Sequence, residues 1–469
     1  MIAETAQYSD PSKVQDIPGK VYLSELMGAL SYALDLTEGL PPGHCLRACW
    51  IGTQIAIELC LDDEALSDTF FTILLKDAGC SSNAARIYEL YDNDDLSVKA
   101  DFYTVNNQSL VQVTKFVWSH LAPHAPIREK LSRLVHLAVN GNELQDEVVS
   151  ARCQRGAAIA KRMGFNDRVA EAINGLNEHW NGNGRPNRLS GSAIPLQSRI
   201  ALLAQVTEIF YSAGGPAQAL KEVYQRSGTW FDPRLVTALS RAAGKPGFWS
   251  TLKSTNLEKT VMSLEPASHA MEVDDQQIDI IAEAFAEVID SKSPFTSGHS
   301  DRVAVFADAI AAELGFSPAR RRWLRRIALL HDIGKLGVSN AILDKPGKLT
   351  DEEWTSIRRH PVYSRSILER ISIFASLAPV AGAHHERLDG RGYPDGISAD
   401  QISIETRVIT TADVFDALTA DRPYRKAMSL EQAMEILEKD RGTAIDGDCL
   451  DALKRAIENS GGALLNSDH

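Results

Sequence analysis

The chain repeats itself, and this internal repeat constrains its fold more than any other feature of the 469 residues. LLKDAGC at residues 74–80 matches LLHDIGK at 329–335, and GHCLR at 43–47 matches GHSDR at 298–302, at one shift of 255 residues (331 − 76). NGNGRP at 181–186 matches DGRGYP at 389–394 at a second shift of 208 residues (389 − 181). Arg199-Ile200 matches Arg407-Val408 at the same shift. Ordered matches at two constant shifts indicate a tandem duplication. The difference of 47 residues predicts an insertion in the first copy, near residues 90–150.

Helical periodicity dominates the sequence from Val21 onward. Leu23, Leu26, Leu30 and Leu34 recur at three- and four-residue spacing, as one face of a helix requires. Strand signals are scarce, and short runs such as residues 102–105 are too isolated to build a sheet. The sequence therefore predicts an all-α protein.

Proline, glycine and acidic residues mark the predicted boundaries. Residues 1–20 are expected to form an irregular leader and residues 460–469 a flexible tail. Residues 251–275 are typical of a linker, although Leu257, Val261 and Met262 could give a short helix. The first copy would then span residues 21–250 and the second residues 276–459.

The net charge of −13 argues against a partner that is a nucleic-acid polymer or an acidic membrane, because such binding needs clustered Lys and Arg. No apolar run reaches the length of a membrane span. The first residues lack the basic and apolar stretches of a signal peptide, so a cytoplasmic location is expected.

Five of the twelve histidines fall between residues 299 and 413, each beside a carboxylate, an arginine or a proline. A buried apolar run ends on His331-Asp332, which would deliver two adjacent ligands to one point. Imidazole and carboxylate together suit a borderline-to-hard transition metal, and no cysteine lies among them to favour structural zinc. The pattern predicts a metal-dependent hydrolase.

Each piece also has an ordinary explanation. His-Asp dipeptides are common, His360 before Pro361 could cap a helix, and Asp413 with Asp416 could form an acidic helix start. Most of these residues are replaced together in the first copy. Residues that are lost together act together, and this favours a shared metal site in the second copy over separate ordinary roles. The first copy has other residues at the positions equivalent to His331, Lys335, His360, His384, His385 and Asp413: these are Lys76, Cys80, Arg152, Leu176, Asn177 and Gln205. Of the candidate ligands only the equivalents of His299 and Asp332 are kept, as His44 and Asp77. The first copy is therefore predicted to be metal-free and inactive.

The motifs HDIGK (331–335) and HHERLDGRGYP (384–394) resemble those of the HD-GYP phosphodiesterases, a subset of the HD superfamily of metal-dependent phosphohydrolases. The resemblance covers about residues 275–455 and, more faintly, residues 25–250. It implies two tandem HD-type helical bundles, the first degenerate and the second catalytic. It also implies hydrolysis of the 3'-5' phosphodiester bond of a cyclic dinucleotide, foremost cyclic di-GMP to linear pGpG and in some members on to GMP. The attacking group would be a hydroxide bridging two divalent metals, iron or manganese.

Carried over to this sequence, the resemblance implies the metal ligands His299, His331, Asp332, His360, His384, His385 and Asp413. Asp332 would bridge the metals and Lys335 would contact the phosphate. Substrate contacts are expected from Arg302, Gly392, Tyr393, Pro394, Arg422 and Arg425, since arginine forks grip phosphate bidentately. Some members hold a third metal with a Glu one turn before the first His. Phe295 stands there in this chain, so a two-metal site is predicted.

Other functions stay open from the sequence. The substrate could be another nucleotide such as cyclic GMP-AMP, or the chain could be a nucleotide-binding sensor without turnover. The first copy could be a packing partner or a regulatory domain, and a homodimer through the N-terminal half is compatible with the sequence.

Overall fold

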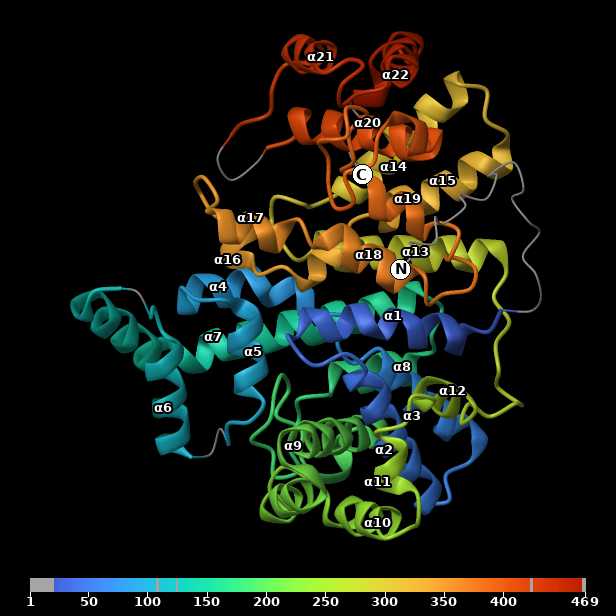
Figure 1. Ribbon diagram of the computed structural model, residues 1–469. Coiled ribbons are helices and arrows are strands. Elements are labelled where there is room, and N and C mark those ends of the chain that lie inside the picture. Colours follow the sequence, from blue (N-terminus) through green and yellow to red (C-terminus); the bar gives the residue numbers. More distant parts are fainter. Residues whose placement is uncertain (1–20, 107–108, 124, 422–424, 466–469) are drawn as a thin grey trace, which may run out of the picture.

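The computed structural model describes residues 21–106, 109–123, 125–421 and 425–465. Within these ranges the chain is all-α, as predicted, and extended pairing is limited to isolated bridges such as that of Tyr22 with Glu272. Figure 1 shows two helical bundles, the first copy below and the second above.

The first copy and the segment that follows it are built from α1 (Leu23–Thr37), α2 (His44–Glu58), α3 (Asp63–Leu74), η1 (Cys80–Asn83), α4 (Ala84–Tyr91), α5 (Asp95–Phe102), α6 (Leu110–His120), α7 (Ile127–Arg162), α8 (Asp167–Asn174), η2 (Gly191–Ala193), α9 (Leu196–Gln225), α10 (Pro233–Ala243), α11 (Phe248–Thr251) and α12 (Leu257–Met262), where η marks a 3-10 turn.

The second copy is built from α13 (Asp275–Asp290), α14 (His299–Glu313), α15 (Pro318–Leu330), η3 (Ile333–Gly337), α16 (Asn340–Leu343), α17 (Asp351–Ile357), α18 (His360–Leu368), α19 (Ala378–Ala383), η4 (Ala399–Gln401), α20 (Ile404–Thr419), α21 (Leu430–Lys439), α22 (Gly447–Asn459) and η5 (Ala463–Leu465).

Equivalent helices begin at equivalent residues. α2 and α14 both follow a glycine in the left-handed region, Gly43 with φ of 83° and Gly298 with φ of 66°. A side chain is disfavoured at such a backbone angle, and in both copies the residue after this glycine is a histidine, the first residue of the helix. α3 and α15 likewise start after side-chain N-caps, Asp62 and Ser317. The duplication read from the sequence is therefore visible in the fold.

The two copies pack against each other reciprocally. α1 of the first copy lies against η3 and α18 of the second, while α13 of the second lies against η1 and α7 of the first (Figure 1). Buried apolar side chains form one continuous core through both copies. Because η3 begins directly after His331-Asp332 and holds the last three residues of the HDIGK motif, the first copy directly supports the segment next to the candidate site.

α6 and the first turns of α7 stand away from the rest of the molecule at the left of Figure 1. We call these two segments, residues 110–120 and 127–140, the arm. They lie within the stretch where the sequence predicts an insertion. No helix among the described residues combines the length and apolarity needed to span a bilayer.

The predicted leader, residues 1–20, and residues 466–469 of the predicted tail lie outside the described residues. α12 forms inside the stretch predicted as a linker, where Leu257, Val261 and Met262 are found. The domain boundaries themselves stay a prediction.

Candidate metal centre

Helix ends bring the predicted metal ligands to one place. His299 and His360 are the first residues of α14 and α18, while His331 and His384 follow the last residues of α15 and α19. Asp413 comes from the middle of α20. A side chain at a helix end can leave the packed face of its helix, so four ends can converge without breaking the core around them.

Asp332 lies between two pairs of histidines. Its Oδ2 atom is 3.3 Å from Nε2 of His299 and 3.3 Å from Nε2 of His331. Its Oδ1 atom is 3.3 Å from Nε2 of His360 and 3.6 Å from Nε2 of His384. One carboxylate thus faces a histidine pair with each oxygen, so Asp332 could contribute to two cation sites if metals bind there.

Asp413 and His385 complete the two groups. Oδ1 of Asp413 is 3.4 Å from Nε2 of His299. The ring centroid of His385 lies 4.1 Å from that of His384 and 5.0 Å from that of His360. The structure therefore brings all seven predicted ligands together, and their role as ligands stays a prediction.

The second nitrogen of each imidazole is held by the protein. Nδ1–H of His331, His360 and His384 donates to the backbone carbonyl three residues earlier, at 2.6 Å in each case. Nδ1 of His299 lies 2.7 Å from the carboxylate of Asp416. At His331, His360 and His384, donation from Nδ1 leaves the lone pair on Nε2, which is the tautomer that metal binding requires.

Electrostatics differ across the site. Burial works against a charged His299, but the carboxylates of Asp332 and Asp416 outweigh it and raise the pKa of His299 to about 9. Burial also opposes ionisation of Asp416, yet His299 and Arg302 lower the pKa of that carboxyl to about 2. At the other end, burial lowers the pKa of His360 to about 4. A strongly negative potential at His299 and a neutral imidazole at His360 both favour cation binding.

Three buried ligand atoms meet no hydrogen-bond partner in the described structure: Nε2 of His299, Nε2 of His331 and Oδ1 of Asp332. Buried polar atoms are normally satisfied, so three orphans facing one point need an explanation. A metal ion supplies one, because imidazole nitrogen and carboxylate oxygen are the donors that transition metals prefer. The residues present therefore fit the predicted metals.

Lys335 lies at the edge of this site. Its ammonium donates to Oδ2 of Asp332 and its side chain is partly exposed. Gly334, beside it, packs so closely on α18 that an added Cβ would lie 2.0 Å from the carbonyl oxygen of His360. Only glycine allows η3 to approach α18 in this way, and Lys335, the next residue, contacts the Asp332 carboxylate.

The loop after His385 wraps around a buried carboxylate. Glu386 accepts hydrogen bonds from two backbone N–H groups of the loop, at 2.6 and 3.0 Å. A Cβ on Gly392 would lie 2.4 Å from the Cα atom of Glu386. The Tyr393 ring lies 4.8 Å from the His385 ring, and the peptide bond before Pro394 is cis. The predicted loop therefore borders the ligand cluster.

The predicted arginines lie in different surroundings. Nε and Nη2 of Arg302 donate to the two oxygens of Asp416 at 2.5 and 3.2 Å. Because Asp416 in turn contacts Nδ1 of His299, Arg302 orients His299 through Asp416. The guanidinium of Arg425 donates to backbone carbonyls at the end of α20. Arg422 lies outside the described residues. Contact of these arginines with a substrate stays a prediction.

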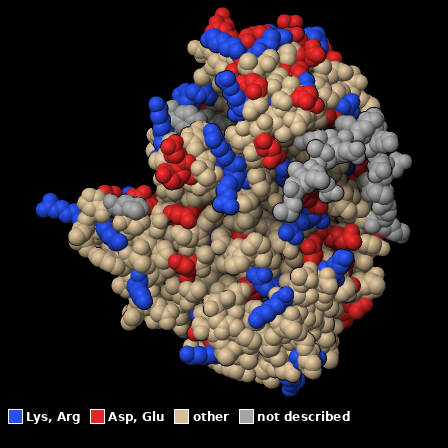
Figure 2. Space-filling view, in the orientation of Figure 1, with Lys and Arg blue, Asp and Glu red and all other residues tan. Residues whose placement is uncertain are grey.

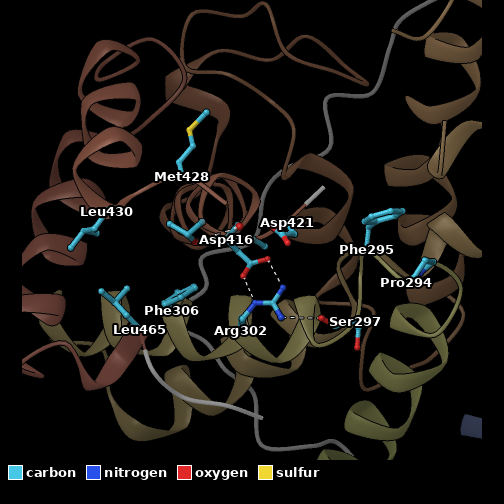
Figure 3. A pocket seen from close by; sticks show the side chains of 12 residues that line it. Pro294, Phe295, Ser297, Arg302, Phe306, Asp416, Asp421, Met428, Leu430 and Leu465 are labelled. Carbon is cyan, nitrogen blue, oxygen red and sulfur yellow. Dashed lines mark hydrogen bonds and ion pairs between the residues drawn. The ribbon is translucent and has the colours of Figure 1, made fainter. Parts of the chain in front are cut away.

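A cavity of about 490 Å³ opens beside the cluster, and the Arg302–Asp416 pair forms part of its wall (Figure 3). Phe295 and Phe306 supply apolar surface, and Asp421 adds a second carboxylate. Its full lining is Pro294, Phe295, Ser297, Arg302, Phe306, Asp416, Thr419, Ala420, Asp421, Met428, Leu430 and Leu465.

The first copy keeps the frame of this site but fills its centre with a side-chain cation. His44 pairs through Nδ1 with Glu208, as His299 does with Asp416. The Lys76 ammonium lies 3.0 Å from Nε2 of His44 and pairs with Asp77. Lys76 thus contacts the equivalents of His299 and Asp332, the ligands that would hold the first metal in the second copy.

Arg152 fills the other side, with Nη2 3.8 Å from Oδ1 of Asp77. Burial opposes the charge of Asp77, but Lys76 and Arg152 lower the pKa of its carboxyl to about 2. Glu38, Asp77 and Cys80 lie close enough to share a cation, yet Lys99 is already 3.6 Å from Glu38. The first copy is degenerate, as predicted, because protein cations stand where metal ligands would be needed.

Sequence reasoning missed two supporting residues. It treated Asp416 only as part of an acidic helix start, and it gave Glu386 no role in shaping the loop. The first copy carried a usable signal for both: Glu208 and Glu178 stand at the equivalent positions, and Glu178 also accepts two loop N–H groups, at 2.6 and 2.9 Å.

Comparison with known proteins agrees with this geometry. The HD domain family model matches residues 129–235 and 283–449. The 3'3'-cGAMP-specific phosphodiesterase 3 of Vibrio cholerae serotype O1 is 52% identical over 435 residues, 93% of this chain and 94% of that protein. The cyclic di-GMP phosphodiesterase response regulator RpfG of Xanthomonas campestris is 35% identical over 207 residues, 43% of this chain and 54% of that protein.

Among solved structures, the crystal structure of the cyclic GMP-AMP-specific phosphodiesterase V-cGAP3 of V. cholerae matches with a TM-score of 0.66 and 46% identity. The match covers 94% of this chain and 98% of that one. A family model that spans both copies and a relative that spans nearly the whole chain lead to one conclusion. The chain belongs to the HD-domain family of metal-dependent phosphohydrolases, and its second copy carries the HD-GYP motifs of that family.

Proposed function

We propose that the chain hydrolyses a 3'-5' phosphodiester bond of a cyclic dinucleotide, and that its preferred substrate is 3'3'-cyclic GMP-AMP. The observation that carries the reaction is the bridging position of Asp332 between two histidine pairs. The 52% identity to a 3'3'-cGAMP-specific enzyme over nearly the whole chain favours this substrate over cyclic di-GMP, the first expectation from the sequence. The shorter and weaker match to a cyclic di-GMP enzyme makes cyclic di-GMP the second candidate.

Two divalent transition metals, iron or manganese, are the proposed cofactors. His299, His331, Asp332 and Asp413 would hold one, and Asp332, His360, His384 and His385 the other. Bound there, such ions supply Lewis acidity at the phosphate and lower the pKa of a coordinated water.

The chain's own groups orient and neutralise the substrate. Lys335 is partly exposed beside Asp332 and can exchange that contact for a phosphate oxygen, which offsets negative charge during the reaction. The Tyr393 ring lies 4.8 Å from the His385 ring, so the loop would shape the approach of the sugar–phosphate ring to the cluster. Six of the seven predicted ligands are buried and His385 is half-buried, which would limit the access of bulk water to the reacting phosphate.

The cavity beside Arg302 is proposed to receive one base of the dinucleotide. Its volume is in the range of small-molecule sites, and it offers aromatic surface for stacking together with a few polar groups. A carboxylate such as Asp421 can accept from an exocyclic amine. An arrangement of this kind can distinguish two bases that differ at their edges.

Chromatography of the products tests the proposal. The metal-loaded protein is incubated with equal concentrations of 3'3'-cyclic GMP-AMP, cyclic di-GMP and cyclic di-AMP. We expect the linear product of cyclic GMP-AMP to form fastest, and a larger kcat/KM for cyclic di-GMP would contradict the substrate assignment.

Replacement of His331 and Asp332 by alanine separates an enzyme from a sensor. Turnover should fall by at least about 10³-fold, because the bridging carboxylate is removed. Circular dichroism of the variant serves as the folding control. Lack of turnover in the wild type on all three nucleotides, with binding retained, would favour the sensor instead.

A further inference from the structure

An arginine at the edge of the candidate metal centre is in contact with two aromatic rings. The guanidinium carbon of Arg358 lies 5.4 Å from the ring centre of Tyr393 and 5.7 Å from that of Trp354, distances typical of cation–π contacts. Trp354 lies one turn earlier in α17, whereas Tyr393 belongs to the loop after His385. The Tyr393 ring also lies 4.8 Å from the His385 ring. Arg358 is therefore connected through one ring to a predicted metal ligand.

The first copy closes the equivalent place with an ion pair. Three residues form the group in the second copy, and their equivalents at the shift of 208 residues are Asp146, Ser150 and Arg185. Nε of Arg185 lies 2.8 Å from Oδ1 of Asp146, so a carboxylate and an arginine join helix and loop there. An ion pair is therefore enough to hold this loop against its helix. Packing alone does not explain why the copy with the predicted ligands has an arginine and two aromatic rings instead.

The charge of Arg358 is available to a ligand. The side chain is exposed and forms no ion pair with any carboxylate of the described residues. The two aspartates of the neighbouring loop have other partners, because Asp389 pairs with Arg387 at 3.0 Å and Asp395 pairs with Arg365 at 2.5 Å. Figure 2 shows acidic and basic side chains side by side over α17 and α18, but the acidic residues of α17 lie in its first turn, at the end of the helix opposite Arg358.

Other exposed basic residues near α17 lie in different surroundings. The guanidinium carbon of Arg359 is 5.6 Å from the ring centre of Tyr363, and that ring lies beside η3. Arg391 and Lys348 are also exposed and form no ion pair among the described residues, but neither has a cation–π contact there. Of these residues, Arg358 is the one whose charge is held against the loop that borders the ligand cluster.

The substrate proposed above carries two phosphates, and one of them is cleaved first. That phosphate lies at the metals beside Lys335, while the other needs a counter-charge from the protein, because the chain as a whole has a net charge of −13. We propose that Arg358 binds the phosphate that is not being cleaved, with Trp354 and Tyr393 holding its guanidinium in place. A guanidinium on aromatic faces keeps its N–H edge free, and this edge matches two phosphate oxygens. The inference rests on the proposed function and adds to it a residue that positions the substrate.

Steady-state kinetics of Arg358→Met in the metal-loaded full chain test the proposal. Methionine keeps an unbranched side chain that can lie on the two rings, but it has no charge and no N–H group. KM for cyclic GMP-AMP should rise at least about tenfold, because a charge-assisted hydrogen bond is lost, while kcat stays within about twofold. Arg358→Lys should recover only part of this loss, since an ammonium is a point charge. Arg359→Met makes the same charge change at the next residue and should behave like the wild type.

A phosphodiester with a single phosphate separates loss of this contact from damage to the site. Hydrolysis of bis(p-nitrophenyl) phosphate by Arg358→Met should match that by the wild type, because this compound has no second phosphate. Cyclic GMP-AMP, cyclic di-GMP and cyclic di-AMP are then compared as competitive inhibitors of that hydrolysis. Their inhibition constants should rise by the same factor in the variant, because a phosphate contact carries no information about the base.

Four results would overturn the proposal. They are an unchanged KM for Arg358→Met, an equal loss of bis(p-nitrophenyl) phosphate hydrolysis, an increase confined to the inhibitors that contain guanine, and an equal increase for Arg359→Met. The second result would make Arg358 a structural support, and the third would assign it to the edge of a base. Failure of the proposed function looks different, because the wild type would then bind these nucleotides as inhibitors without hydrolysing them.

Discussion

At the residue scale, the two copies differ in what lies at the centre of the same buried site. The second copy has the predicted metal ligands there, and the first copy has the ammonium group of a lysine. In the second copy His331 leaves Nε2 without a partner, and in the first copy Lys76 extends its ammonium to His44 and Asp77. Burying a carboxylate such as Asp77 is costly unless a positive charge accompanies it. Lys76 therefore supplies the positive charge that Asp77 needs in a copy without the predicted metal ligands.

Glu208 of the first copy gives a pH-dependent prediction. Burial disfavours its ionised form, but His44 and Arg47 outweigh burial and lower its pKa to about 2 from 4.5. A depressed pKa stabilises the fold above pH 4.5, and this stabilisation is lost as the pH falls from 4.5 toward 2. At pH 7 Glu208→Gln should cost about 3 kcal/mol, or on the order of 3 °C in Tm for a single core of this size, and the deficit should shrink toward pH 3.

Calorimetry at several pH values measures this difference. Glu64→Gln is the control, since Glu64 pairs with Arg168 at 2.5 Å on the surface and should cost less than about 1 kcal/mol. A deficit for Glu208→Gln that stays constant from pH 7 to pH 3 would show that the ion pair is not its cause.

Phe295 gives a prediction about metal content. By the resemblance to the HD-GYP family it stands where some members have the Glu that holds a third metal, and its side chain lines the cavity beside the cluster. Elemental analysis of the metal-loaded wild type should find two ions per chain. Phe295→Glu should raise this to three, while Phe295→Gln, which has a similar shape but no charge, should stay at two. Three ions in the wild type would refute the two-metal prediction.

The sequence was most informative about residues whose chemistry is local. His331-Asp332 and His384-His385 are adjacent in the chain, so their motifs could be read directly. Asp416 could not be read in this way, because it lies far along the chain from His299 and its partner is fixed by packing of α20 on α14. The fold class followed from periodicity, which is also a local property.

At the element scale, a buried carboxylate of the first copy holds the loops around the second copy's site. Oδ1 of Asp95, in α5, accepts from the backbone N–H of Asn340 at 2.7 Å, just beyond η3. Its Oδ2 atom is 3.6 Å from the buried ammonium of Lys292 and 3.7 Å from that of Lys99. Burial lowers the pKa of Lys292, and the charge of Asp95 opposes that shift. Asp95 thus ties α5 to the segments before α14 and after η3.

Asp95→Asn is therefore expected to act across the copies. It keeps an oxygen for Asn340 but removes the carboxylate charge beside Lys292 and Lys99. Lys99 keeps Glu38 at 3.6 Å, so Lys292 is the buried ammonium that loses its ion-pair partner, at a cost of about 3–5 kcal/mol in unfolding free energy. kcat should fall more than KM changes, because the segment that carries Lys335 loses a support while the cavity keeps its lining. Asp101→Asn, at an exposed position of the same helix, should leave stability and kcat within error. If Asp95→Asn and Asp101→Asn have the same stability and the same kcat, Asp95 does not support the second copy's site.

At the scale of the whole molecule, the two copies are parts of one core. Helical periodicity and the repeat predicted two bundles, but neither could predict how they pack, because the contacting faces are apolar in both and no local signal pairs them. In the structure α1 covers η3 and α18, and the guanidinium of Arg370 lies 3.9 Å from the Tyr32 ring across the contact. Ser81 and Ser291 also meet across it, at 2.8 Å.

This arrangement predicts what removal of the first copy does. A fragment of residues 270–469 keeps all seven predicted ligands but exposes the apolar surfaces of η3, α13 and α18 that α1 and α7 cover. We expect a lower Tm than the full chain and turnover reduced by at least about tenfold, since the supports of Lys335 and His360 lie partly in the missing copy. Differential scanning calorimetry and product chromatography measure the two effects. A fragment as stable and as active as the full chain would mean that the first copy does not support the site, and higher turnover in the fragment would make it an inhibitory domain.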